Sequence, residues 1–355
     1  MKTLDFNQWA VVAHKDDTGF GRQARDLRKV LSLGRHIVIP SERLIDHPLD
    51  PHDEVLLPGN VPETRVKEIL QGLQGIIFFE RPSWHSDLLR CARELGVATV
   101  CVPNWEWFRA DDKKWNNCDL FACPNDMALQ TVRRYGRTNS VLLPWCLDLE
   151  SLPAQSVAGP ARIFVHNAGL VDPDDRKGTR DTVESFLRTR RKDIRLIVRI
   201  QKEAPLPEMD ERIDVQVGNV QNHADLYRKV DVAIQPSKME GIGFMILEAV
   251  CAGLPVITTD YPPMNEYVLQ PELRVRTHWW KRKAFPTAWV KHAHLRLPRR
   301  DDLVRCIEWC ADHDMERFSK QNRAWAREIF SADHLRRQWS EAFDAHLFST
   351  TNSRP

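Results

Sequence analysis

Short apolar runs alternate with longer amphipathic segments along the first half of the chain. The runs predict buried strands, and the segments between them, such as 66–73 and the stretch ending at Leu33, have helical spacing. The predicted strands are Ala10–Ala13, His36–Pro40, Gly75–Phe79, Val97–Val102 and Asp119–Pro124. Strands that alternate with helices are typical of a parallel, doubly wound sheet. Residues 1–150 are therefore predicted to form a Rossmann-like α/β domain, with 41–62 as a long loop.

The same alternation returns after a stretch of small and polar residues, 151–160, which we interpret as a linker. The next predicted strands are Ala161–His166, Ile194–Ile200, Val215–Val217, Asp231–Gln235 and Val256–Thr259. This pattern predicts a second Rossmann-like domain over 151–330. The last apolar periodicity, from Ala332 to Phe348, predicts a terminal helix in the segment 331–355.

The segment Pro236–Val268 has the most informative pattern in the second domain. A predicted strand ends at Pro236, Gly241 and Gly243 precede an apolar helix, and Gly253 and Pro255 end that helix. A helix N-terminus offers backbone N–H groups and the positive end of a dipole. Glycine at that position lets a ligand approach the backbone closely. The pattern is consistent with a phosphate-binding helix start.

Two carboxylates, Glu240 and Glu248, frame this predicted helix. One interpretation is structural, with an acid near the helix N-terminus and another on a polar face. The other interpretation is functional, because Glu248 lies within an apolar stripe where a carboxylate is costly without a partner such as a sugar or ribose hydroxyl.

Polar and aromatic residues also follow the predicted strands of the first domain. They are His14, Glu80, His85, Asn104, Trp105 and Glu106. Ligands of open α/β sheets bind beyond the carboxyl ends of the strands. Gly19 and Gly21 come after the first strand, and they indicate either a tight turn or a ligand-binding loop.

Composition narrows the class of protein. Lys and Arg number 51 and Asp and Glu 49, so the net charge of +2 gives no sign of a nucleic-acid arm or an acidic tail. The first residues lack the apolar segment of a signal peptide, and no stretch is apolar for the length of a membrane span. Eight scattered cysteines are typical of free thiols in a reducing compartment, which predicts a cytoplasmic protein. No metal site is predicted.

The segment Leu273–Arg300 departs from this balance, because it is rich in Trp, Lys, Arg and His and contains no acid. Its notable residues are Trp279, Trp280, Lys281, Arg282, Lys283, Trp289, Lys291, His292 and His294. It is either an ordinary hairpin with tryptophans packed underneath or a surface for an anionic or aromatic acceptor. Acceptors of that chemistry include a phosphorylated lipid headgroup, an acidic polysaccharide and DNA with a modified base, so peripheral contact with a membrane is also compatible with it.

The pattern P-S-x-x-E-G-x-G-x-x-x-L-E-A-x-x-x-G-L-P-V-I, from Pro236 to Ile257, resembles the donor-site signature of retaining GT-B glycosyltransferases of the family-4 type. The resemblance implies two Rossmann-like domains facing a cleft and a C-terminal helix that crosses back to the first domain. It also implies hexosyl transfer from a nucleotide sugar, UDP- or GDP-linked, with retention of configuration. No metal or other cofactor is expected.

The resemblance assigns roles to individual residues. Lys177, before Gly178, would contact the donor pyrophosphate, Glu240 the sugar hydroxyls and Glu248 the ribose. Other donor contacts would come from Gly19, Gly21, Asn219, Val220, Gly241, Ile242, Gly243 and Phe244. The family's arginine after the first strand of this domain is replaced by Asn167, Ala168 and Gly169, and either Arg176 or Arg199 could supply that charge.

The reaction centre and the acceptor are less well defined. The family often places a histidine near the reaction centre, where this chain has Asn104, with His85 one strand earlier; each alone is more often structural. Trp105, Trp279, Trp280, Lys281 and Arg282 are the candidate acceptor contacts. The acceptor could be a saccharide, a lipid-linked or small molecule, or nucleic acid. A non-catalytic GT-B partner module is the remaining alternative, and sugar-nucleotide epimerisation is a weaker one.

Overall fold

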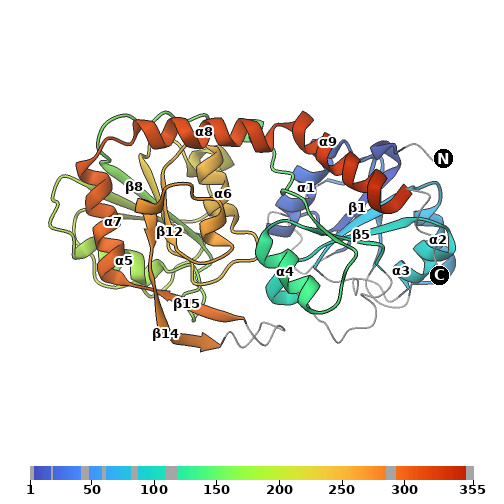
Figure 1. Cartoon of the computed structure of the whole chain (residues 1–355), viewed down its shortest axis with the longest axis horizontal. Helices are drawn as coiled ribbons and strands as arrows, with labels where there is room; N and C mark the ends of the chain where they lie inside the picture. Colours follow the sequence, from blue (N-terminus) through green and yellow to red (C-terminus); the bar gives the residue numbers. More distant parts are fainter. Residues whose placement is uncertain are drawn as a thin grey trace. The chain divides into compact units, whose positions relative to one another are not determined.

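A computed structural model describes residues 4–16, 19–40, 48–57, 61–80, 87–108, 118–284 and 293–348. The chain forms two compact units (Figure 1). Unit 1 contains Met1–Asp148, Ala288–Lys291 and Ile329–Pro355, and unit 2 contains Leu149–Thr287 and His292–Glu328. Each unit is built on its own parallel sheet, so the predicted fold class, two doubly wound α/β domains of the GT-B type, is confirmed.

The sheet of unit 1 has the strand order β3-β2-β1-β4-β5-β6-β7. Its strands are β1 (Trp9–Ala13), β2 (Arg35–Val38), β3 (Asp53–Val55), β4 (Gly75–Phe79), β5 (Ala98–Val102), β6 (Leu120–Cys123) and β7 (Ser140–Leu142). Every residue of β1, β4 and β5 is buried. Such continuous apolar runs are expected where helices cover both faces of a parallel sheet.

The helices of unit 1 are α1 (Gly19–Leu31), α2 (Glu63–Leu70), α3 (Leu88–Glu94), α4 (Asp126–Arg134) and α9 (Ala332–Phe343). Although α9 is last in the sequence, it packs on the first elements of unit 1. The Phe343 ring lies 4.6 Å from that of Trp9, and Arg336 Nε donates to the Val30 carbonyl over 2.6 Å. The expected return of the terminal helix to the first domain is therefore confirmed.

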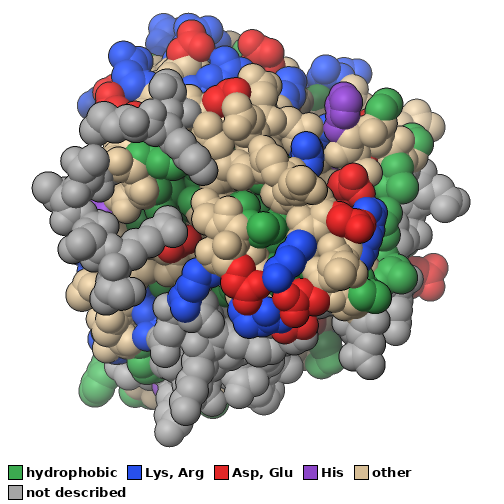
Figure 2. Space-filling model, turned by 90° about the vertical axis from the view of Figure 1, so that its right-hand side faces the viewer, with side chains coloured by type: hydrophobic (Ala, Val, Ile, Leu, Met, Phe, Trp, Pro, Cys, Tyr) green, Lys and Arg blue, Asp and Glu red, His purple; other side chains and the backbone are tan. Residues whose placement is uncertain are grey.

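The surface of unit 1 around α2 and α3 carries mixed charge. Lys67 pairs with Glu63 at 2.6 Å and with Glu94 at 2.7 Å, and Arg90 pairs with the same two glutamates. On the face shown in Figure 2, cationic and acidic side chains are interspersed.

Unit 2 repeats the architecture with a sheet of order β10-β9-β8-β11-β12-β13. Its strands are β8 (Ile163–Gly169), β9 (Arg195–Ile200), β10 (Ile213–Val217), β11 (Val232–Gln235), β12 (Val256–Thr259) and β13 (Arg274–Val275). Its helices are α5 (Thr179–Leu187), α6 (Phe244–Cys251), α7 (Arg300–Asp312) and α8 (Glu316–Phe330). The chain runs outward from β8 to β10 and then returns to β11 beside β8. This reversal is the switch point at which open α/β sheets bind ligands.

A two-stranded antiparallel ribbon, β14 (Thr277–Ala284) and β15 (His294–Pro298), follows β13 and stands apart from the main sheet. It corresponds to the Trp-rich basic segment. The remaining short helical turns are η1 (Phe6–Gln8), η3 (Trp105–Trp107), η5 (Leu149–Ser151), η6 (His223–Leu226), η7 (Met264–Glu266), η8 (Pro271–Leu273) and η9 (Asp344–Phe348). No helix among the described residues is long and apolar enough to cross a membrane.

Candidate donor site

Two loops meet at the switch point of unit 2. Residues 170–178 follow β8 and residues 236–243 follow β11. The Lys238 amide donates to the Arg176 carbonyl over 2.7 Å. Gly178 has a φ of 74°, and a Cβ at this position would lie 2.5 Å from the Pro236 carbonyl oxygen. The Lys-Gly pair is thus explained structurally, since only glycine permits this approach of the two loops.

Glu240 lies against two cations at this junction. Lys177 Nζ is 2.7 Å from Glu240 Oε1, and Arg176 Nη1 is 3.3 Å from Oε2. Arg176 also donates to the Met239 carbonyl over 3.2 Å. The glutamate is 4 % exposed. The structure therefore brings together three residues that the sequence placed 64 positions apart at most.

The cations determine the ionisation of this carboxylate. Burial raises the pKa of Glu240, but the charges of Lys177 and Arg176 lower it further than burial raises it, so the net shift is downward. The glutamate is thus ionised at neutral pH. Arg176 Nε also lies 4.0 Å from a carboxylate oxygen of Asp172, so two cations and two carboxylates meet here. The Lys177 ammonium and the Arg176 guanidinium are groups that bind phosphate oxygens.

Helix α6 begins next to this cluster. Its N-cap residue, Gly243, has a φ of 83°, and an added Cβ would lie 3.5 Å from Glu240 Cγ. The first turn of α6 therefore lies beside the Glu240 side chain. The positive end of the helix dipole adds to the field of Lys177 and Arg176. Gly241, Ile242 and Phe244 belong to the same buried or half-buried loop and first turn.

Glu248 is fully buried in α6, and its Oε2 accepts two hydrogen bonds. The Tyr227 hydroxyl donates over 2.5 Å, and His223 Nε2 lies 2.8 Å away. The protein itself therefore supplies partners for this carboxylate. Sequence reasoning missed both residues, because the segment containing them has no motif beyond an aromatic residue and a histidine four positions apart.

The two arginines that could replace the family's upstream charge are in different places. Arg176 contacts Glu240, as described above, whereas Arg199 lies on β9 and donates to the Leu226 carbonyl over 2.8 Å and to Gln216 over 3.0 Å. Burial lowers the pKa of Arg199. Its hydrogen-bond partners are Leu226, Gln216 on β10 and Asn167 on β8, and none of these three belongs to the Lys177 loop. Asn219 follows β10 and accepts from Gln201 over 3.0 Å, while Val220 is half-buried beside it.

The predicted residues of unit 1 are better explained by its structure. A Cβ on Gly21 would lie 1.9 Å from the Asp16 carbonyl oxygen, so tight packing accounts for this glycine, whereas Gly19 has open space around it. Trp105 is 2 % exposed, so its ring is part of the core and is not offered to solvent as an acceptor platform.

Asn104 remains a candidate near the end of β5. Its Nδ2 donates to Glu80 Oε1 over 2.8 Å, and its Oδ1 is buried without a hydrogen-bond partner in the described part of the chain. Glu80 has a φ of 60°, a strained conformation for a residue with a side chain. Strain and an unsatisfied buried atom often occur at functional positions. His85, the other predicted candidate, lies outside the described residues.

The ribbon exposes its tryptophans. Trp279 is 74 % exposed and Trp280 is 61 % exposed, so neither packs underneath the strand. Lys281 and Arg282 continue β14, although their side chains are outside the description. Trp289, Lys291 and His292 are also outside the described residues.

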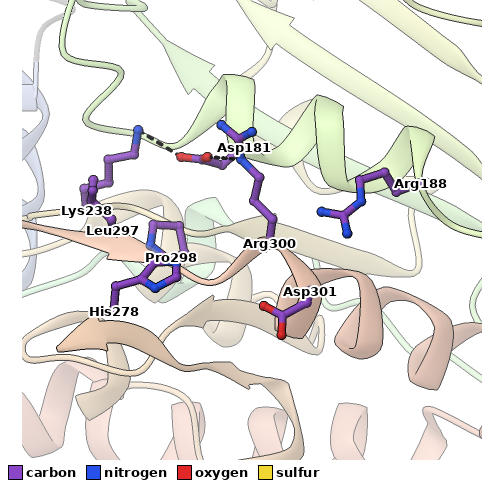
Figure 3. A pocket seen from close by; sticks show the side chains of 8 residues that line it. All are labelled: Asp181, Arg188, Lys238, His278, Leu297, Pro298, Arg300 and Asp301. Atoms are coloured by element: carbon purple, nitrogen blue, oxygen red, sulfur yellow. Dashed lines mark hydrogen bonds and ion pairs between the residues drawn. The ribbon is translucent and has the colours of Figure 1, made fainter. Parts of the chain in front are cut away.

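A cavity of about 560 Å³ lies between α5, the ribbon and the start of α7 (Figure 3). It is lined by Asp181, Arg188, Lys238, His278, Leu297, Pro298, Arg300 and Asp301. Asp181 forms ion pairs with Lys238, at 2.9 Å, and with Arg300, at 2.7 Å, and dashed lines mark both in Figure 3. None of the predicted donor residues lines it, and its lining has three cations and two acids.

Metal ligation finds no support in the side chains described. Across residues 4–348, outside the undescribed stretches, no three His, Cys, Asp or Glu residues are grouped to hold a metal ion. The eight cysteines are buried, and all are free thiols. Burial raises the pKa of Cys306 to about 12, which keeps this thiol protonated.

Comparisons with known proteins agree with this geometry. Residues 161–280 match the family described as "Glycosyl transferases group 1". A 52-residue stretch is 40% identical to the lipopolysaccharide core biosynthesis mannosyltransferase LpsB of Rhizobium meliloti. That stretch covers 15% of this chain and spans 15% of the length of the relative.

Solved structures resemble the whole chain. The apo form of the lipopolysaccharide outer core galactosyltransferase WaaB has a TM-score of 0.63 and 13% identity, covering 96% of this chain and 99% of that one. HepE of Anabaena, solved with UDP and glucose, has a TM-score of 0.63 and 12% identity, covering 95% and 99%. At such identities the likeness establishes the fold. The chain has the GT-B fold, and the group 1 match over residues 161–280 supports its assignment as a glycosyltransferase.

Proposed function

We propose that this protein transfers a hexosyl group from a UDP- or GDP-linked donor to a lipid-linked saccharide, with retention of configuration and without a metal. The observation that carries the proposal is the cluster of Lys177, Arg176 and Glu240 at the start of α6, at the switch point of unit 2. The group 1 family match covers this cluster.

The cluster suits the charge that develops in glycosyl transfer. When the bond to the leaving diphosphate breaks, negative charge grows on the phosphate oxygens. Lys177, Arg176 and the N-terminus of α6 would stabilise that charge, because they are fixed in place by burial and hydrogen bonds before the donor binds. Glu240, ionised between the two cations, would accept hydrogen bonds from the hydroxyls of the donor sugar.

Glu248 would act at the nucleoside end of the donor. Its Oε2 is held by Tyr227 and His223, which fix the orientation of the carboxylate in α6. A carboxylate at a nucleotide site usually accepts hydrogen bonds from ribose hydroxyls. The neighbouring Asn219 and Val220, after β10, would lie towards the base, as the resemblance implies.

The names of two similar proteins support the proposed acceptor class. LpsB and WaaB are named for transfer within lipopolysaccharide, which is a lipid-linked saccharide. Their names differ in the sugar transferred, mannose for one and galactose for the other, so the sugar is left open. No comparison favours a nucleic-acid acceptor or a non-catalytic role.

The test is a panel of nucleotide sugars that includes GDP-mannose, UDP-galactose and UDP-glucose. A donor that binds the native state raises its melting temperature by mass action, and the free energy of unfolding rises by about 2.7 kcal/mol at a hundredfold excess over Kd. We expect stabilisation by one donor and by its nucleoside diphosphate. Turnover is then measured with that donor and a lipid-linked saccharide. A panel without any stabilising nucleotide would contradict the proposal.

A further inference from the structure

The ribbon of β14 and β15 concentrates positive charge. From Leu273 to Arg300 the sequence has nine cationic residues and no Asp or Glu, although the whole chain has a net charge of only +2. The nine are Arg274, Arg276, Lys281, Arg282, Lys283, Lys291, Arg296, Arg299 and Arg300. This segment, which runs from the end of η8 to the start of α7, therefore carries a local excess of positive charge.

Acidic partners lie mainly at the base of the ribbon. Arg276 pairs with Asp302 at 2.9 Å, and Arg300 pairs with Asp181 at 2.7 Å. Further along β14, Lys283 pairs with Asp174. Arg282 is in register with Arg296 across the two strands, and the guanidinium carbon of Arg296 lies 4.1 Å from the centroid of the Tyr261 ring. In the sequence, Lys281 and Arg282 add two cations directly after the tryptophans.

The ribbon also presents the largest exposed aromatic area in the described part of the chain. Trp279 and Trp280 are 74 % and 61 % exposed, higher than any other large hydrophobic residue described. The two residues lie where the register of the ribbon shifts, between Thr277 and Arg282, and their ring centroids are 5.4 Å apart, so both indoles belong to one exposed patch. Two accessible indole rings beside Lys281 and Arg282 in the sequence form an amphipathic element.

We propose that this ribbon seats the protein on a membrane surface that contains anionic lipid. The indoles of Trp279 and Trp280 would lie at the level of the lipid headgroups, where Trp is preferred. The neighbouring lysine and arginine residues would be attracted to lipid phosphates, an interaction that strengthens binding about fivefold for each cation near the surface. This inference concerns binding to a bilayer and goes beyond the proposed transfer reaction.

The ring geometry favours a bilayer over single-stranded nucleic acid. The two indole rings have centroids 5.4 Å apart and planes at 83° to each other. In this arrangement the edge of one ring faces the other, so the pair does not form a platform for successive bases. Insertion into the headgroup region requires only accessible apolar area with a polar N–H, and the pair provides both.

The ribbon is joined to the loops of the candidate donor site. The Arg296 amide donates to the Lys238 carbonyl over 2.8 Å, two positions before Glu240, and Asp174 lies in the loop that precedes Lys177. Seating the ribbon on a bilayer would therefore hold these loops near the membrane. If the proposed function holds, a lipid-linked acceptor would reach the protein from this membrane surface.

The experiment is co-sedimentation of the full chain with phosphatidylcholine vesicles, with and without phosphatidylglycerol. We expect binding only to the anionic vesicles, with a steep decrease as salt is added, because salt screens charges beyond about 8 Å at physiological strength. Trp279→Ala/Trp280→Ala should weaken binding at least about fivefold, and Lys281→Glu/Arg282→Glu at least about tenfold. Brominated lipid should quench tryptophan fluorescence in the wild type but much less in the double Trp variant.

Lys192→Glu/Lys202→Glu is the matched control, since it makes the same charge change at exposed positions of unit 2 outside the ribbon and should bind as the wild type does. Far-ultraviolet circular dichroism and donor-induced stabilisation check that each variant is folded. The proposal would be overturned by equal binding to both vesicle types, by wild-type binding of both ribbon variants, or by binding to single-stranded DNA in the absence of binding to vesicles. None of these readouts requires turnover, so failure here leaves the proposed reaction untouched.

Discussion

Glu240 depends on Lys177 and Arg176 in two different ways. Both cations lie within 3.3 Å of its carboxylate oxygens, and the site is largely closed to solvent. Removal of one partner from a buried ion pair typically costs about 3–5 kcal/mol, because a charge is left buried without compensation. A loss of activity in a single variant would therefore mix chemistry with folding, and a double variant is needed to separate them.

We expect Lys177→Met to lower both the melting temperature and the transfer rate, the latter by at least about tenfold. Lys177→Met/Glu240→Gln should recover much of the melting temperature, because Arg176, which also loses Glu240, still has Asp172 at 4.0 Å, but transfer should stay low. Differential scanning calorimetry and initial rates with a defined donor make the comparison. Wild-type turnover in the double variant would show that the pair has no role in transfer.

Substitutions of Arg176 and Arg199 should affect the affinity for the donor differently. Arg176 contacts Glu240, whereas Arg199, on β9, donates a hydrogen bond to the Leu226 carbonyl. Arg176→Ala should raise the Kd of the donor about tenfold or more, because a charge near the diphosphate is lost. Arg199→Ala should mainly lower stability. Isothermal titration with the nucleoside diphosphate measures the affinity, and Arg190→Ala, at an exposed position, is the control.

If Arg199→Ala proved the more damaging to affinity for the nucleoside diphosphate, the charge supplied by the family's missing arginine would come from β9 instead. The sequence alone left both arginines open because they are equally cationic and each follows or ends a predicted strand. Only the contacts of the folded unit distinguish them. This limit applies to any residue whose role depends on which loop it reaches.

At the scale of the element, the motif around α6 was predictable, but the residues that contact Glu248 within it were not. Gly241, Gly243 and the apolar run after them indicate a strand–loop–helix unit, and the structure has β11, the loop and α6 in those places. Tyr227 and His223 were missed because their contact with Glu248 spans 21 and 25 positions of sequence. Periodicity reports burial within an element but not the partner across it.

The same reasoning explains a missed strand. The loop predicted over 41–62 contains β3, Asp53–Val55, at the edge of the sheet of unit 1. Two of its three residues are acidic, so it has no apolar run. Asp53 is held by Lys15 and by Arg28, which lies 3.1 Å away. An edge strand fixed by ion pairs gives no hydrophobic signal.

Gly178 offers a prediction about the junction of two loops. Gly178→Ala should destabilise the protein and weaken donor binding, because the new Cβ would collide with the Pro236 carbonyl oxygen 2.5 Å away and displace Lys177. Gly159→Ala is the control, since this glycine has the same φ of 74° but open space around it. It should cost only the strain of the left-handed conformation, about 1–2 kcal/mol, and leave donor affinity unchanged.

Thermal unfolding and donor titration of the two variants give the answer. Equal losses of stability, with donor affinity retained in both, would mean that the close approach at Gly178 does not position Lys177.

His166 ties three elements of unit 2 together and makes its stability depend on pH. Its Nδ1–H donates to the Ile234 carbonyl of β11 over 2.7 Å, and its Nε2 lies 3.0 Å from Thr179 Oγ1 at the start of α5. Both contacts suit the neutral ring. Burial lowers the pKa of His166 from 6.5 to about 4.

Because the folded pKa is below the unfolded value, the unfolded chain binds the proton first as pH falls. The contribution of His166 to the free energy of unfolding is complete above about pH 6.5. It decreases by about 3 kcal/mol as the pH falls towards 4. His166→Gln, which does not titrate, should show a smaller decrease of the free energy of unfolding over that range. Urea unfolding at a series of pH values provides the measurement. An identical slope in the variant would contradict the assignment.

At the scale of the whole molecule, the division into two α/β domains was predictable because each has its own alternation of strands and helices. The return of the last helix to unit 1 was expected from the family resemblance and is confirmed by the contacts of Phe343 and Arg336. The exposure of Trp279 and Trp280 was not predictable. The sequence pattern around a tryptophan is the same whether its ring packs in a core or is exposed to a partner.

The last prediction concerns the reaction of the complete protein. In the proposed site, the charge of the leaving diphosphate is balanced by Lys177, Arg176 and the N-terminus of α6, which are positioned by protein contacts. Cations supplied in this way need no metal ion to bridge the phosphates. We therefore expect donor binding and turnover to survive EDTA. A decrease of more than about tenfold that added Mg²⁺ or Mn²⁺ restores would show that a metal takes part.

The product should also keep the anomeric configuration of the donor. The Glu240–Glu248 motif resembles that of a family of retaining enzymes, so we expect retention here. The measurement is the one-bond C–H coupling at the anomeric carbon of the purified product, compared with that of the donor. An inverted anomer would require the nucleophile to approach from the opposite face. It would overturn the proposed mechanism while leaving the fold and the donor site in place, because both rest on the sheet topology and on the contacts of Glu240.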